Sequence, residues 1–171
     1  MTLAEFKKYL AICRIGGGGA GQPSSYVHAQ SGASVVVSGV SEKTLLASIP
    51  VAGGVLGEHG AFRITALWSF TRSTNDKRMI IEYGGYTVLA TNQNIPSYAS
   101  VQVITIVRNR GVLNRQITTA TGNAGIGGSQ GEVTALGVDT AKENAIEFYA
   151  SVADANDSVS LEGYTIEVLN P

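Results

Sequence analysis

The sequence has little charge and almost no cysteine or histidine. Only 15% of its 171 residues are charged, against roughly 25% in typical soluble domains. Its one cysteine, Cys13, excludes a disulfide within the chain and fits maturation in a reducing cytosol. One cysteine and two histidines without regular spacing are too few for a zinc site of nitrogen and sulfur ligands. Since no activated nucleophile or acid–base pair stands out either, we expect no metal, no cofactor and no enzymatic activity.

Long apolar segments are also missing. No run of about 18 apolar residues is present, so the sequence predicts no transmembrane helix. Residues 2–14 lack the apolar core of a secretory signal. We therefore expect a soluble protein without a membrane partner.

The residue types that are abundant in the chain are typical of an all-β domain. Hydrophobic residues make up 44% of the sequence and 21 residues are glycine, which favours a folded chain with tight turns. A length of 171 residues is enough for one domain with its own core. The low charge also indicates that partner subunits cover part of the surface.

The charges are unevenly distributed along the chain. Residues 43–115 contain eight Lys or Arg and three Asp or Glu, whereas residues 132–171 contain one and eight. Either the two regions face each other within the domain, or the basic region of one subunit attracts the acidic region of the next. No dense basic patch is present in the sequence, so we expect no nucleic-acid partner.

The clearest structural pattern lies in residues 61–85. Apolar and polar residues alternate over 61–70, a polar run follows at 71–76, and a second apolar stretch ends at a Gly-Gly pair. Alternation with a period of two places one set of side chains on each face of a strand. We interpret the stretch as a β-hairpin that carries Trp68, the only tryptophan, on its buried face.

Further strands are predicted from residue 33 onward, and together they favour an antiparallel β-sandwich of jelly-roll type. The last two strands are expected to pair through a turn at 154–157. The predicted strands are 33–38, 43–50, 61–70, 77–83, 86–90, 100–109, 132–138, 145–153 and 158–169. The predicted core includes Phe62, Ile64, Trp68, Ile80, Val103, Phe148, Ile166 and Val168.

The N-terminal region differs from the rest and is predicted to form an arm. Residues 2–13 have helical spacing, and Thr2 begins a capping box. The glycine-rich segment 16–25 follows as a flexible linker. We therefore divide the chain into an arm at 1–25 and a β-sandwich domain at 26–171. The short helix either contacts a partner protein or folds back on its own sandwich; its apolar stripe contains Leu3, Phe6 and Leu10, with Cys13 at the end.

Several short motifs have both a functional and a structural interpretation. The glycines of 16–21 match the spacing of a dinucleotide-binding loop, but a helix and not a strand precedes them, so we interpret them as linker. The turn at 154–157 could hold Ca²⁺ or be an ordinary Asx-rich turn, and we favour the turn. His59 is interpreted as part of a polar turn and not as a pH sensor. Residues 118–131 are uncharged and glycine-rich, which favours packing against a neighbour.

A surface for sugars is a further candidate. Exposed aromatic rings with polar neighbours can bind glycans, although most of the tyrosines lie on strands and are expected to pack against the sheets. The candidate glycan-binding residues are Tyr86, Asn92, Asn94 and Tyr98, all predicted to lie in or near one loop region.

Residues 57–85, GEHGAFRITALWSFTRSTNDKRMIIEYGG, resemble a run in the β-sandwich modules of tailed-bacteriophage virion proteins. Those modules carry a G-x-x-G, a strand of R-I-x-A-L-W-S type, a T-N-x-x-x-K turn and an apolar strand that ends in Gly-Gly. Residues 107–116 and 158–169 are similar as well, whereas the arm lies outside the resemblance. The resemblance implies a jelly-roll-like fold, assembly into trimers on a virion, and no enzymatic activity.

We therefore expect a structural protein of a bacteriophage virion, assembled in the host cytoplasm. On the first hypothesis the chain is a capsid decoration or cement protein, which forms a homotrimer and binds the major capsid protein. The alternative is a tail-fibre or spike module, which binds a tail protein and recognises a host surface glycan.

Overall fold

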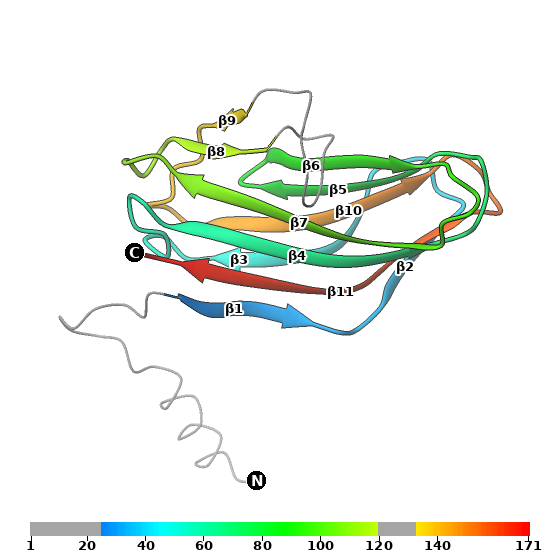
Figure 1. Ribbon diagram of the computed structural model, residues 1–171, viewed down its shortest axis with the longest axis horizontal. Coiled ribbons are helices and arrows are strands. Elements are labelled where there is room, and N and C mark those ends of the chain that lie inside the picture. The colour runs from blue at the N-terminus through cyan, green and yellow to red at the C-terminus, as the bar shows by residue number, and fades with distance from the viewer. Residues whose placement is uncertain (1–24, 120–132) are drawn as a thin grey trace, which may run out of the picture.

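The computed structural model describes residues 25–119 and 133–171, and in these ranges the chain is all-β. Sheet A has seven strands in the order β1-β11-β4-β7-β8-β9, with β2 also paired to β11; sheet B has four, in the order β3-β10-β5-β6 (Figure 1). Sheet A contains β1 (Ser25–Ser31), β2 (Val35–Ser38), β4 (Ala61–Phe70), β7 (Ser100–Asn109), β8 (Gln116–Thr118), β9 (Thr134–Leu136) and β11 (Ser158–Leu169). Sheet B contains β3 (Thr44–Val51), β5 (Lys77–Tyr83), β6 (Tyr86–Gln93) and β10 (Asn144–Val152).

Some predictions concern residues that the structure does not describe. These are the N-terminal helix and linker, the partner-binding residues Leu3, Phe6 and Leu10, and most of the uncharged segment 118–131. No helix in the described ranges is long and apolar enough to cross a membrane.

The two sheets enclose one apolar layer, which confirms the predicted β-sandwich. In β4, the side chains of Phe62, Ile64 and Trp68 are fully buried and alternate with partly exposed residues. The ring of Phe148 in β10 stacks on Tyr164 in β11, with the centroids 5.0 Å apart. Burying each such side chain contributes about 1.5–3 kcal/mol, so this layer is the main source of stability.

The predicted core residues are all buried, although one of them faces away from the others. All except Ile80 belong to the cluster between the sheets. Ile80 alternates with Met79 and Ile81, which do belong to that cluster. Its partners on the adjoining strands are Tyr149 and Ala90, so Ile80 is covered on the outer face of sheet B.

The predicted hairpin at residues 61–85 is wrong. β4 and β5 have the predicted bounds, but β4 lies in sheet A between β11 and β7, whereas β5 lies in sheet B between β10 and β6. The connection 71–76 therefore crosses from one sheet to the other. A connection of this length easily spans the roughly 10 Å between packed sheets, and alternation looks the same whether a strand pairs with its successor or crosses over.

The same correction applies to the last two strands. β10 and β11 alternate as predicted, but they lie in different sheets, so the turn at 154–157 joins the sheets and does not close a hairpin.

A true hairpin joins β5 to β6, and its turn residues Gly84 and Gly85 have φ of 54° and 79°. This left-handed region favours glycine. Two further strands, β1 and β8, are not among the predicted ones.

A buried ion pair fixes one end of the sandwich. The side chains of Lys77 and Asp157 are 1% and 3% exposed, and Nζ lies 3.8 Å from Oδ2. Nζ of Lys77 donates hydrogen bonds to the Ser73 hydroxyl at 2.7 Å and to the Asn75 carbonyl at 2.6 Å. Oδ2 of Asp157 accepts from the side chains of Ser73 and Asn75 at 2.8 and 3.0 Å. These contacts tie two inter-sheet connections together and satisfy charges whose burial would otherwise be destabilising.

A second buried network, without charge, fixes the opposite end. Gln116 donates to Oδ1 of Asn109 at 2.9 Å and to the carbonyl of Val138 at 3.0 Å, and its Oε1 accepts from the N–H of Val138 at 2.9 Å. Asn109 donates to the Gly57 carbonyl and to the Thr140 hydroxyl. The network therefore joins the three connections that follow β3, β7 and β9.

Candidate functional site

The outer face of sheet A exposes apolar side chains. Leu67 of β4 and Ile106 of β7 are 44% and 40% exposed, and Ile104 lies partly exposed on the same face. Their uncharged neighbours in register are Thr65 and Gln102. We call these five residues the sheet A face. Neighbouring apolar side chains on one sheet face make it a candidate surface for contact with another protein.

Charged side chains lie around the sheet A face. Arg63 and Glu167 form an ion pair with Nε 2.5 Å from Oε2, and the hydrogen bonds from Arg63 hold the pKa of Glu167 below its usual value. Arg108 lies exposed on β7, and Glu162 lies on β11, where it accepts a hydrogen bond from Ser69. Because β4 separates β7 from β11, one side of the face is basic and the other acidic.

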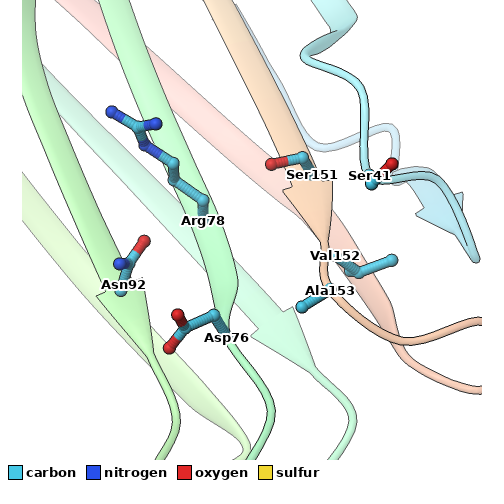
Figure 2. A pocket seen from close by; sticks show the side chains of 7 residues that line it. All are labelled: Ser41, Asp76, Arg78, Asn92, Ser151, Val152 and Ala153. Carbon is cyan, nitrogen blue, oxygen red and sulfur yellow. The ribbon is translucent and has the colours of Figure 1, made fainter.

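A polar hollow of about 270 Å³ lies on the outer face of sheet B (Figure 2). Ser151 of β10, Arg78 of β5 and Asn92 of β6 are direct neighbours in register and form one row across three strands. We call it the Arg78 hollow. Its lining consists of Ser41, Asp76, Arg78, Asn92, Ser151, Val152 and Ala153.

The polar groups of the Arg78 hollow are held by the strand pattern. Arg78 faces outward because its neighbours Lys77 and Met79 are buried. Asp76 immediately precedes β5, and its Oδ1 accepts a hydrogen bond from Nδ2 of Asn94 at 3.1 Å. Among the described residues, Arg78 belongs to none of the ion pairs. The Arg78 side chain is exposed on this face.

The structure brings together only part of the predicted glycan site. Asn92 lines the Arg78 hollow, and Asn94 reaches it through Asp76. Tyr86 begins β6 at the hairpin turn, roughly 20 Å from Asn92 at about 3.3 Å per residue. The prediction of one loop region is therefore wrong for Tyr86. Tyr98 lies in the loop after β6 and is 54% exposed, outside the lining of the hollow.

The two charged residues of the hollow, Arg78 and Asp76, are missing from the sequence prediction. Only the pairing of β5 with β6 shows that they lie beside Asn92 and Asn94. Alternation gives no signal for Arg78, because Lys77 precedes it and the three residues that follow it are all apolar.

Three other tyrosines on strands, Tyr83, Tyr149 and Tyr164, pack against the sheets, as expected. Tyr83 is 1% exposed, and burial raises its pKa to about 12. Tyr164 packs in the core. Tyr149 lies on the outer face of sheet B, where Nζ of Lys43 is 3.9 Å from the ring centroid. None of these three rings offers an open platform for a sugar.

Part of the uneven charge is paired within the domain. The ion pairs Arg63–Glu167 and Lys77–Asp157 each join the basic region of the chain to the acidic one. The inward position of Asp157 also removes a carboxylate from the surface of the turn considered for Ca²⁺. In the part of the chain that the structure describes, no group of three His, Cys, Asp or Glu side chains could hold a metal ion.

Neither a protein-family model nor a curated protein matches this chain.

Proposed function

We propose that this chain is a non-enzymatic structural protein of a bacteriophage virion, which forms a homotrimer through the sheet A face and decorates the capsid. The sheet A face is the observation that carries the proposal, because it leaves Leu67 and Ile106 in solvent on a face with few charges. In an assembled particle those side chains are covered. The arm, through Leu3, Phe6 and Leu10, supplies the contact with the capsid.

The proposed fold is a jelly roll, and the strand order supports it. Without β1, β8 and β9, four strands remain in each sheet, in the orders β2-β11-β4-β7 and β3-β10-β5-β6. An eight-stranded double sheet is the arrangement of jelly rolls, which viral capsid domains use.

The motifs behind the resemblance occupy positions that the fold constrains. A Cβ at Gly60 would lie 2.2 Å from Oδ1 of Asn170. Trp68 and Lys77 are buried, and Gly84 has a positive φ. Residues that a fold requires recur in other proteins of that fold. These positions therefore support a fold shared with the virion modules. They do not indicate where on a virion the protein lies.

The occupant of the sheet A face is a second copy of the chain. Arg108 lies on one side of the face and Glu162 on the other, so the basic side of one copy can meet the acidic side of the next. A reciprocal contact of this kind is two-fold and gives a dimer, whereas a one-way contact is heterologous and closes into a ring when the rotation between copies allows. A trimer is the smallest such ring.

Light scattering on the purified protein tests the self-association. We expect a mass three times that of the 17.8 kDa chain. Replacing Leu67 and Ile106 by Arg should give a monomer with an unchanged circular dichroism spectrum, because the side chains contribute only to the contact. The matched control is Val112→Arg, which alters a loop residue with the same 40% exposure as Ile106. A stable wild-type monomer at micromolar concentration would contradict the proposal.

The tail-fibre alternative is favoured by the Arg78 hollow, because a receptor-binding module needs a polar site for a glycan. Sedimentation of the purified protein with empty capsids or with host cells separates the two functions. Binding to capsids supports decoration, whereas binding to cells alone supports the tail-fibre function.

A further inference from the structure

The Arg78 hollow concentrates polar side chains from three neighbouring strands on one outer surface. Arg78 and Asn92 are directly opposite in register, which places their Cβ atoms about 5 Å apart. Ser151 lies on the other side of Arg78, so the row extends over two strand spacings, about 10 Å. Asp76 and Asn94 lie next to this row and bond each other at 3.1 Å.

The arrangement offers both donors and acceptors on one surface. The guanidinium of Arg78 has five donors in a planar fork. Asn92 can donate and accept, and the carboxylate of Asp76 retains acceptor capacity beyond its bond to Asn94. Figure 2 shows Arg78, Asn92 and Asp76 on one side of the hollow and Ser151 and Ser41 on the other.

The size of the hollow limits the ligand. A volume of about 270 Å³ lies just below the roughly 300–1,000 Å³ of sites for drug-sized molecules. The exposed Ala153 adds apolar surface, which can contact the C–H groups of a sugar ring. A single sugar residue, free or at the end of a longer glycan, therefore matches the site in size and polarity.

The charges define the class of sugar. A guanidinium fork matches a carboxylate in geometry and charge. Asp76 lies two residues from Arg78 on the same side of the strand, roughly 7 Å away, and a carboxylate there accepts hydrogen bonds from hydroxyls. The same carboxylate repels a doubly charged phosphate more than a singly charged acid.

We propose that the Arg78 hollow binds an acidic sugar residue, with its carboxylate on Arg78 and its hydroxyls on Asp76, Asn92 and Ser151. The site lies on sheet B, away from the sheet A face. The inference therefore does not depend on the proposed trimer or on where the protein sits on a virion.

Nuclear magnetic resonance titration of the full-length protein tests the proposal with methyl β-D-glucuronide as the probe and methyl β-D-glucoside as its neutral match. We expect the glucuronide to shift the backbone amides of Arg78, Asn92 and Ser151, with a dissociation constant of roughly 1 mM. The glucoside should bind at least about tenfold more weakly, because it lacks the charge-assisted bonds.

Arg78→Gln should weaken glucuronide binding at least about tenfold and leave glucoside binding unchanged, with no change in melting temperature since the side chain is exposed. The matched control, Arg110→Gln, removes an exposed arginine from the loop that follows β7 and should bind as the wild type does. Asp76→Asn should weaken both sugars.

Three results would overturn the proposal. The first is equal binding of the two glycosides, which would mean a neutral-sugar site. The second is acetate alone binding as tightly as the glucuronide, which would mean an anion site without sugar recognition. The third is absence of binding at 20 mM, about twenty times the expected dissociation constant. None of these results affects the light-scattering test of the trimer.

Discussion

Lys77 and Asp157 illustrate how two charges are accommodated inside the end of a sandwich. Each charged group has hydrogen bonds to Ser73 and Asn75 in addition to its opposite charge. Removing one partner of a buried pair leaves an uncompensated charge, which typically costs about 3–5 kcal/mol. Among the residues of the 57–85 motif, Lys77 is therefore the one that matters most for the connection 71–76.

Asp157 makes the stability of the domain sensitive to acid. Hydrogen bonds from Ser73 and Asn75 and the charge of Lys77 hold the pKa of Asp157 below its usual value, although desolvation opposes them. Because the folded-state pKa is the lower one, this stabilisation is complete above the unfolded pKa of about 3.9. It is lost as the pH falls through the folded-state pKa. We predict that Asp157→Asn lowers the urea midpoint at pH 7 and reduces its decline between pH 5 and pH 3.

The decline should not vanish in this variant. Glu167 and Asp139 also have lowered pKa values, through hydrogen bonds from Arg63 and Lys142. The matched control is Glu143→Gln, which changes an exposed carboxylate and should be as stable as the wild type at pH 7. If the urea midpoint of Asp157→Asn falls in parallel with that of the wild type, the acid sensitivity has another source.

At the scale of elements, Gln116 connects strands that contribute few contacts of their own. β8 and β9 are three residues long, and the Gln116 side chain bonds both Asn109 and the backbone of Val138. Gln116→Ala leaves those buried groups without partners, at roughly 1–3 kcal/mol for each such group. We predict a loss of about 3 kcal/mol in the free energy of unfolding, measured by urea denaturation.

Gln30→Ala is the matched control for that experiment. Gln30 is an exposed glutamine on β1, and its replacement should change the stability by less than about 0.5 kcal/mol. Equal effects of the two substitutions would show that the buried network does not stabilise the end of the sandwich.

The strands themselves were predictable because their signal is local. β4, β5, β7 and β11 have the predicted bounds, since alternation and glycine-rich turns define a strand without reference to its partner. Pairing is not local. The connection 71–76 could equally close a hairpin or cross between sheets, and the choice depends on the whole set of strands.

The candidate site was only partly predictable for the same reason, because it depends on strand pairing. Asn92 was predictable as a polar residue near a loop, but its neighbour Arg78 is identified only by the register of β5 against β6. Tyr86 was misplaced because β6 extends to Gln93, beyond the predicted end at residue 90. The longer strand moves Tyr86 and Asn92 to opposite ends of one element.

The whole molecule presents two outer surfaces of opposite character. The sheet A face is apolar at its centre, whereas the outer face of sheet B carries the Arg78 hollow and the Lys43–Glu82 ion pair. Since each sheet contributes only its inner face to the core, the outer faces can serve different purposes. Self-association through the sheet A face would leave the outer face of sheet B open, so the proposed trimer and the proposed sugar site are compatible.

The arm is the remaining part of the proposed assembly. The described domain begins with β1 at Ser25, so deletion of residues 1–22 leaves all the strands of the described ranges intact. A helix of about twelve residues is marginally stable alone and needs a surface to dock on. We predict that the truncated protein keeps its trimeric mass and melting temperature but no longer sediments with empty capsids.

A single substitution tests the role of the arm in capsid binding without shortening the chain. Phe6→Ser removes the largest apolar side chain of the stripe and should weaken capsid binding, whereas Lys7→Ser, off the stripe, should not. A truncated protein that melts well below the wild type but still binds capsids would mean that the arm folds back onto its own sandwich. In that case Leu3, Phe6 and Leu10 belong to the core, and the capsid contact must be sought on the strands.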